Sequence, residues 1–197
     1  MNSERIGQQL KFLNEIEALK VVYRRNRTND RSRLENSAEH SWHVALMALV
    51  FAEHANEPKL NILKVIKLLL IHDLVEIYAG DTWIYDAADT ETQESRENEA
   101  ARRLFNLLPC DQAKEYHALW TEFEEKQTPE AKYATSIDLL QPLANHLLSG
   151  AASDEGPKPE VKSVVQKKSA IADASSALWV LAQGLIEQSA DKGLYTY

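Results

Sequence analysis

The stretch that decides the fold of this chain is Leu69-Leu-Leu-Ile-His-Asp-Leu-Val-Glu-Ile77. Its apolar residues predict a buried helix, yet His72 and Asp73 stand side by side within it. Burying a charged carboxylate without a partner is very unfavourable, and a metal ion is one of the few partners that offset this cost. The pair therefore predicts a metal site that is built into a helical core.

Helical signals dominate the rest of the chain. The sequence has only six glycines and no alternating strand pattern with hairpin turns. Asn36 and Glu39 predict a capping box, and Thr128-Pro129 predicts an N-cap followed by proline in the first turn. The predicted fold class is therefore all-α. The expected helices cover about residues 4–22, 37–56, 58–79 (closed by Gly80), 91–108, 111–126, 129–148 and 161–189.

Size and composition favour one soluble domain over residues 1–197. The content of 44% hydrophobic and 26% charged residues is that of an ordinary globular protein, and the net charge of −8 argues against general nucleic-acid binding. The single cysteine, Cys110, excludes an internal disulfide and suits a reducing compartment. No signal-peptide core and no apolar run of bilayer length are present, so we expect a cytoplasmic protein without a membrane partner.

Further candidate ligands accompany the His-Asp pair. Glu76 shares a helical face with both residues, because it lies four positions after His72 and three after Asp73. His40 falls in the first turn of another predicted helix, and Asp138 falls in the middle of a later one. Two histidines and two aspartates suit a divalent metal with mixed nitrogen and oxygen preference, such as Mn, Co, Fe, Ni or Zn.

An isolated His-Asp dipeptide is more often a surface feature or a satisfied ion pair. Here Asp138 is the only acid between Glu130 and Asp154, in a mostly apolar helix, and this isolation favours the metal site.

A second local signal is a cluster of basic residues. Five of the nine arginines lie between Arg24 and Arg33, and guanidinium groups match phosphate oxygens, although a solvated basic loop is the usual explanation.

These residues carry a resemblance to a known family. The segments 38–42 (Ala-Glu-His-Ser-Trp), 71–82 (Ile-His-Asp-Leu-Val-Glu-Ile-Tyr-Ala-Gly-Asp-Thr), 119–124 and 138–142 (Asp-Leu-Leu-Gln-Pro) resemble the HD-domain phosphohydrolases. More narrowly, they resemble the branch that contains bacterial and eukaryotic 5′-deoxynucleotidases. The resemblance covers about residues 8–150 and leaves the expected C-terminal helix, about 161–189, without a chemical signal.

The resemblance implies an α-helical HD-domain bundle, a nucleoside 5′-monophosphate as substrate and a homodimer. It implies one divalent metal ion (Mn, Co, Fe, Ni, Zn or Mg), because binuclear relatives carry extra histidines before the last aspartate and only His117 lies in that interval here. The implied metal ligands are His40, His72, Asp73 and Asp138.

The resemblance also suggests roles around the metal. Glu76 is the candidate for orienting or deprotonating the attacking water, with an outer-sphere bond to a ligand histidine as its alternative. Asp81 is expected to contact the sugar or to assist the leaving oxygen. Arg25 and Arg33 are expected to bind the phosphate. Asn26 stands where the bacterial relatives carry tryptophan, so the preference between deoxyribose and ribose is left open.

Together with this resemblance, the sequence predicts a metal-dependent phosphoric monoester hydrolase that removes phosphate from (deoxy)nucleoside 5′-monophosphates. Two alternatives remain open at this point: hydrolysis of another small phosphoester, and a non-catalytic helical regulatory domain that a metal stabilises. Glu39 is expected to serve the capping box, and Glu35 to hold an arginine of the basic cluster.

Overall fold

Helices make up most of the structure. The computed structural model describes residues 2–80, 90–150 and 158–197 of the chain. In these parts the only paired strands with more than a single bridge are β1 (Tyr23–Arg27) and β2 (Leu34–Asn36), which form an antiparallel ribbon. The all-α prediction is confirmed. The helices are α1 (Asn2–Glu15), α2 (Ser37–Val50), α3 (Ile62–Ile71), α4 (Glu76–Ala79), α5 (Thr90–Phe105), α6 (Cys110–Glu125), α7 (Pro129–Ser149), α8 (Val161–Lys168), α9 (Ile171–Ala174) and α10 (Ser176–Asp191), with 3₁₀ segments η1 (Ile16–Val21), η2 (Ala52–His54) and η3 (His72–Val75).

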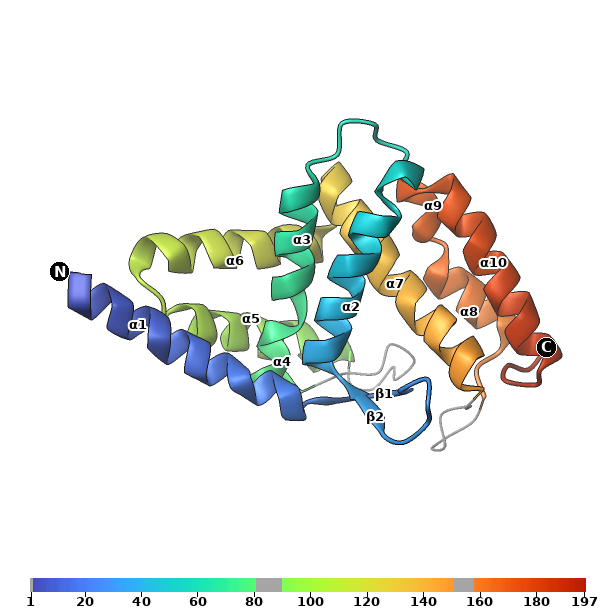
Figure 1. The fold of residues 1–197 in the computed structure, drawn as a ribbon, viewed down its shortest axis with the longest axis horizontal. Coiled ribbons are helices and arrows are strands. Elements are labelled where there is room, and N and C mark those ends of the chain that lie inside the picture. The colour runs from blue at the N-terminus through green and yellow to red at the C-terminus, as the bar shows by residue number, and fades with distance from the viewer. Residues whose placement is uncertain (1, 81–89, 151–157) are drawn as a thin grey trace.

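Three helices form the centre of the molecule. α2, α3 and α7 pack against one another, with α1, α5 and α6 on one side and α8, α9 and α10 on the other (Figure 1). The β1–β2 ribbon lies at the start of α2, and α7 contacts β1. No helix in the described ranges combines the length and the apolar character that a membrane crossing requires.

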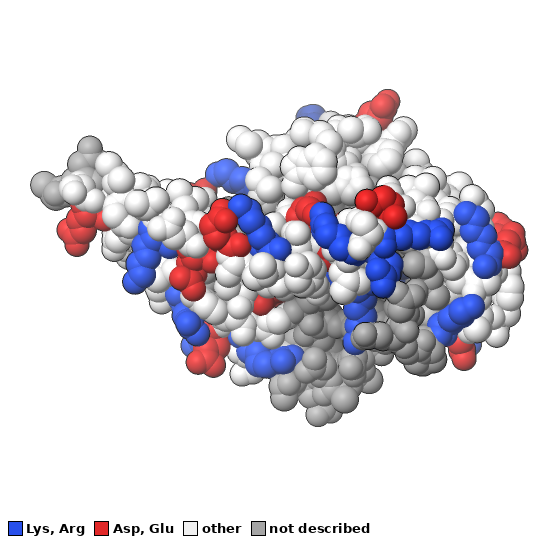
Figure 2. Space-filling view, turned by 60° about the horizontal axis from the view of Figure 1, so that its bottom comes forward, with Lys and Arg blue, Asp and Glu red and all other residues white. Residues whose placement is uncertain are grey.

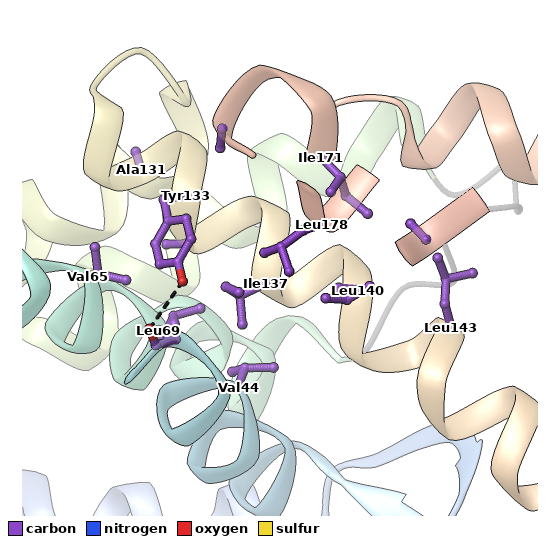
Figure 3. Close-up of a cluster of buried hydrophobic side chains, with 14 of the residues drawn as sticks. Val44, Val65, Leu69, Ala131, Tyr133, Ile137, Leu140, Leu143, Ile171 and Leu178 are labelled. Atoms are coloured by element: carbon purple, nitrogen blue, oxygen red, sulfur yellow. Dashed lines mark hydrogen bonds between the residues drawn. The ribbon is translucent and has the colours of Figure 1, made fainter. Parts of the chain in front are cut away.

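Two apolar clusters meet at the stretch that carries the His-Asp pair. Leu68 and Leu69 belong to the cluster that α2, α3, α7 and the C-terminal helices build (Figure 3), where the Tyr133 hydroxyl donates to the Ala48 carbonyl at 3.2 Å. Leu74 and Val75 belong to the second cluster, with α1, α5 and α6. The segment is therefore buried on more than one side, which explains its almost continuous apolar sequence.

Local signals placed several helix ends correctly. The Asn36 side chain accepts from the Glu39 amide at 3.0 Å and the Glu39 carboxylate accepts from the Asn36 amide at 2.7 Å, so the capping box is confirmed. The Thr128 hydroxyl caps α7 by accepting from the Ala131 amide, with Pro129 in the first turn. Gly80 ends α4 at a φ of +79°, a conformation that favours glycine.

Other boundaries differ from the prediction. The first helix changes to a 3₁₀ segment at Ile16, and the helix expected from about residue 58 starts at Ile62, because the Asn61 side chain caps it. The expected C-terminal helix is divided into α8, α9 and α10. Ser175 has extended backbone and its hydroxyl accepts from the Leu178 amide, so it starts a new helix inside the apolar periodicity.

Candidate metal centre

Four side chains from three elements converge next to the β1–β2 ribbon, whose Arg24 donates to one of them, Asp73. His40 comes from the first turn of α2, His72 and Asp73 from η3, and Asp138 from the middle of α7. His40 Nε2 lies 2.9 Å from Asp138 Oδ1 and 3.9 Å from Asp73 Oδ2. His72 Nε2 lies 3.0 Å from Asp73 Oδ1 and 3.6 Å from Asp138 Oδ1. The structure thus brings together all four side chains that the sequence nominated as ligands.

Local backbone geometry helps to place the pair from η3. The chain tightens from α-helix to 3₁₀-helix at His72 and returns to α-helix at Glu76. Side chains in a 3₁₀ turn are spaced differently from those in an α-helix. His72 and Asp73 are both buried here, and the Phe123 ring packs against His72 with 4.8 Å between ring centroids.

In both imidazole rings, Nδ1 has a hydrogen-bond partner on the edge opposite Nε2, and this contact orients the ring. His72 Nδ1 lies 2.8 Å from the Leu69 carbonyl oxygen, which can only accept, so Nδ1 carries the proton in the neutral ring. His40 Nδ1 lies 3.1 Å from Gln141 Oε1. In the neutral form of both rings, Nε2 is therefore the nitrogen that faces the carboxylates with a lone pair available, as metal-binding histidines require.

A series of buried hydrogen bonds connects the Nδ1 edge of His40 to Gln141 and Glu35. The Gln141 amide nitrogen donates to Glu35 Oε1 at 2.7 Å, and this bond leaves the Gln141 oxygen to accept from His40. Asn145 donates to the same Glu35 oxygen at 3.1 Å. Arg24 lies with Nε 3.8 Å from Glu35 Oε2 and donates from Nη1 to Asp73 Oδ2 at 2.9 Å. The expectation that Glu35 holds an arginine of the basic cluster is confirmed.

The charges of the cluster shift its pKa values. Burial lowers the pKa of His72, but the nearby carboxylates of Asp73 and Asp138 outweigh it, so the pKa lies well above its ordinary value. Burial raises the pKa of Asp138, but its close contacts with His40 and His72 hold it well below the usual range. For Asp73, the charges of His72 and Arg24 likewise outweigh burial and lower the pKa.

This donor set fits a divalent metal ion. His40, His72 and Asp73 each offer a ligand atom within 4.8 Å of the others, and all three residues are buried. His72 Nε2 is enclosed yet forms no hydrogen bond, although it points at carboxylate oxygens. Imidazole nitrogens and carboxylate oxygens together suit Mn, Fe, Co, Ni or Zn better than a site of oxygens alone would. These residues could therefore bind a divalent cation, whose charge would compensate that of the buried carboxylates.

Of the two candidate catalytic carboxylates, Glu76 belongs to the part of the chain that the structure describes. Glu76 follows η3 directly, and the Ser37 hydroxyl at the start of α2 donates to its Oε2 at 2.6 Å. This bond ties Glu76 to the helix that carries His40. Asp81 lies outside the described residues.

Of the five arginines between Arg24 and Arg33, Arg24 reaches the cluster. Side chains alternate along a strand, so Arg24 is largely buried on β1 while Arg25 is exposed on its other face. Arg33 is half-exposed and donates to both carboxylate oxygens of Glu39 from its two terminal guanidinium nitrogens, Nη1 and Nη2, at 2.5 and 2.7 Å. Figure 2, which brings the ribbon side of the molecule forward, shows several basic side chains close together with acidic ones among them. The assignment of Arg25 and Arg33 to the phosphate stays a prediction.

Sequence reasoning missed several residues of the site. Gln141 and Asn145 could have been found, because they follow Asp138 at spacings of three and seven and so share its helical face. Arg24 could not be distinguished from its four neighbours, since the strand that sorts them depends on a pairing between distant residues.

Comparisons with known proteins agree with this geometry. A family model described as HD domain matches residues 16–179. The crystal structure of a predicted metal-dependent phosphohydrolase from Magnetospirillum magnetotacticum superposes with a TM-score of 0.90 at 40% identity, over 98% of this chain and 99% of that one. A conserved hypothetical protein from Pyrococcus furiosus, with a TM-score of 0.61 at 18% identity, shares the fold.

Curated relatives carry more specific names. The human protein 5′-deoxynucleotidase HDDC2 is 33% identical over 130 residues, which are 66% of this chain and 62% of that protein. The Bos taurus protein of the same name is 36% identical over 105 residues, 53% of this chain and 49% of that protein. The chain therefore matches from about half to just under two thirds of the length of these relatives.

Proposed function

Because the chain belongs to the HD domain family, we propose that it is a metal-dependent phosphohydrolase that releases phosphate from nucleoside 5′-monophosphates. The names of the human and bovine relatives support a 5′-deoxynucleotidase activity. One observation carries the proposal: two imidazole Nε2 atoms and two carboxylates converge in a buried cluster with Arg24 beside them.

Each residue of the cluster has a role in this proposal. His40, His72, Asp73 and Asp138 hold one divalent metal ion. When bound, such an ion polarises the phosphate and makes water more acidic. Glu76 orients the attacking water and accepts its proton, and Ser37 fixes the carboxylate for this task. Asp81 assists at the sugar or the leaving oxygen.

Cations at the rim complete the site. Arg24 donates to Asp73 Oδ2, and we propose that its guanidinium also contacts the phosphate. Arg25 and Arg33 remain our candidates for further contacts to the phosphate. In this proposal the positive charges stabilise negative charge on the transferred phosphoryl group.

Three broader features also belong to the proposal. Residues 1–197 form one catalytic domain, because α7 contacts elements on both sides of the centre. The protein is a cytoplasmic homodimer. Exposed Trp42, Leu46 and Leu49 along α2 support an apolar interface, which light scattering of the purified protein tests.

The experiment that tests the function is phosphate release from a panel of ribo- and deoxyribonucleoside 5′-monophosphates, with Mn, Co, Mg, Zn or EDTA. Asp73→Ala is compared with Asp191→Ala, an exposed aspartate at the end of α10. We expect metal-dependent release that disappears in Asp73→Ala and persists in Asp191→Ala. The panel determines the base and the sugar preference.

Absence of release from folded, metal-loaded protein with every nucleotide would refute the nucleotidase activity and direct the search to other phosphoesters. A metal that raises the melting temperature strongly while no phosphoester is hydrolysed would instead indicate a regulatory domain.

A further inference from the structure

A buried carboxylate on the ribbon has no part in the chemistry described so far. Glu35 lies in β2, and only 5% of its surface is exposed. The ribbon lies at the same end of the molecule as the start of α2 and the C-terminal half of α7 (Figure 1). Burial of a carboxylate is unfavourable unless hydrogen bonds and a counter-charge compensate it, so the contacts of Glu35 indicate what its burial secures.

The two oxygens of Glu35 have different surroundings. Oε1 accepts from Gln141 Nε2 at 2.7 Å and from Asn145 Nδ2 at 3.1 Å, which lie one turn apart on α7. Oε2 is enclosed and accepts no hydrogen bond from the described residues, and it lies 3.8 Å from both His40 Nδ1 and Arg24 Nε. The carboxylate therefore lies between the Nδ1 edge of His40 and the polar face of α7.

Glu35 determines which end of the Gln141 amide faces His40. A glutamine amide has one donating end and one accepting end. Because Glu35 Oε1 also receives the Asn145 amide, it is an acceptor, and the NH₂ group of Gln141 must face it. His43 Nδ1, 3.3 Å from Gln141 Nε2, does not decide this direction, since a ring nitrogen can donate or accept. The Gln141 oxygen is thus left for His40 Nδ1, at 3.1 Å.

The direction of this amide affects metal binding. An accepting oxygen beside His40 Nδ1 keeps the hydrogen of the neutral ring there, so the lone pair of Nε2 is available on the side of Asp138. An amide that is turned over would present its NH₂ group to Nδ1. The hydrogen would then be favoured on Nε2, and a protonated nitrogen cannot bind a metal.

We propose that Glu35 is a positioning residue of the metal centre, which acts on His40 through Gln141 and selects Nε2 as the metal-binding nitrogen. The inference rests on the metal centre of the proposed function and extends it to the ribbon. Glu35 does not contact the metal or the substrate in this proposal. A residue of β2 thereby determines how strongly the histidine of α2 binds the metal.

The test is a double-mutant cycle on zinc affinity, measured by competition with a chelating dye. Zinc suits this donor set and has a filled d shell, so it also permits NMR. The chains compared are the parent, Glu35→Leu, Gln141→Leu and the double variant. Glu187→Leu, which changes an exposed glutamate of α10 in the same way, is the control. Nitrogen NMR of the zinc-loaded chains reports which nitrogen of His40 carries the hydrogen.

We expect Glu35→Leu to lower the zinc affinity by about ten- to hundred-fold, the loss typical of residues that orient a metal ligand. In the Gln141→Leu background, Glu35→Leu should cause no further loss, because the residue through which it acts is already absent. The parent should show the His40 hydrogen on Nδ1, and Glu35→Leu should shift or weaken this signal. Glu187→Leu should behave as the parent does.

Unchanged zinc affinity and an unchanged Nδ1 signal in Glu35→Leu would overturn the inference, and a lower melting temperature alone would show that Glu35 is structural. Losses that add in the double variant would also overturn it, because Glu35 would then act independently of Gln141. If Glu35→Leu does not fold, Glu35→Asp replaces it: the charge is kept, the reach to Gln141 is shortened, and the same signals should change to a smaller extent.

Failure of this inference is distinguishable from failure of the proposed function. A parent chain that binds zinc and follows the expected cycle, yet hydrolyses no nucleotide, supports the positioning role and refutes the nucleotidase activity. A parent chain that hydrolyses nucleotides while Glu35→Leu binds zinc equally well refutes the positioning role alone. A folded parent chain that binds no divalent metal refutes both.

Discussion

Gln141 Oε1 accepts a hydrogen bond from His40 Nδ1 at 3.1 Å, on the ring edge opposite His40 Nε2, which lies 2.9 Å from Asp138 Oδ1. The two α7 residues, Asp138 and Gln141, therefore hold one imidazole from both edges. This contact fixes which ring nitrogen faces the cluster. Partners of this kind tune metal ligands without binding the metal themselves.

Removal of this contact should weaken metal binding. We expect Gln141→Leu to lower the affinity for the metal by about ten- to hundred-fold, because the His40 ring loses its orientation and Glu35 loses a donor. Metal titration of the purified variant measures the change. Gln166→Leu, at an exposed position of α8, is the control. Unaltered affinity in Gln141→Leu would show that packing alone orients His40.

Arg24 and Arg33 should differ in their importance for activity. Arg24→Met removes the partner of buried Asp73, so we expect kcat/KM to fall by about a hundred-fold, in line with the loss of a hydrogen bond between charged groups. Arg33→Met removes a half-exposed pair with Glu39 and should change kcat/KM much less. Steady-state kinetics of both variants measure this. A larger loss in Arg33→Met would support the phosphate role that the sequence predicted for Arg33.

Metal binding should release a proton. The pKa of His72 in the metal-free folded protein is raised well above its ordinary value of 6.5, which favours the protonated ring, whereas a ligand nitrogen must be neutral. Metal affinity should therefore rise with pH up to the folded pKa of His72. Calorimetry in buffers of different ionisation enthalpy measures the proton, and a binding enthalpy independent of the buffer would contradict the prediction.

The same shift predicts how the metal-free protein responds to pH. A pKa that is raised on folding stabilises the protein below its unfolded value, and this contribution is lost as pH rises through the folded pKa. Asp138 acts in the opposite direction: its lowered pKa stabilises the fold above the unfolded value of 3.8 and stops doing so as pH falls. The melting temperature without metal should thus decline on both the alkaline and the acid side, which thermal unfolding across pH measures.

Ser37 should matter for turnover more than for metal binding. Ser37→Ala removes the donor to Glu76 Oε2, so the carboxylate loses its fixed orientation toward water. We expect kcat to fall by roughly ten-fold while metal affinity stays unchanged, the size expected for one hydrogen bond to a charged group. Ser176→Ala, on exposed α10 surface, is the control. Equal kcat in Ser37→Ala and the parent would exclude this positioning role.

Core substitutions separate packing from hydrogen bonding. Ile137→Ala opens a cavity beside Asp138 in a fully buried part of α7 and should lower the free energy of unfolding by about 2–5 kcal/mol. Tyr133→Phe removes only the hydroxyl bond to Ala48 and should cost about 1 kcal/mol. Denaturant unfolding of both variants measures the difference. A cost for Tyr133→Phe equal to that for Ile137→Ala would show that the hydroxyl is more important than packing.

Local signals in the sequence predicted much of the fold. Capping at Asn36 and Thr128, the glycine after Ala79 and the apolar periodicity gave most helices, because these depend on residues close together in the chain. Breaks inside periodic segments were not predicted. The change to 3₁₀-helix at His72 and the new start at Ser175 leave the apolar pattern intact.

By itself, the sequence determined the helical class and the residue types of a metal centre, since His40, the His72-Asp73 pair and Asp138 stand out as polar groups in apolar helices. Only the tertiary structure decided which other side chains contact and orient these metal-site residues. The pairing of β1 with β2 turned Arg24 inward and Arg25 outward, and the packing of α7 against α2 brought Gln141 to His40 across 101 residues of chain. Such contacts depend on how elements distant in sequence pack together, which no local pattern of residues encodes.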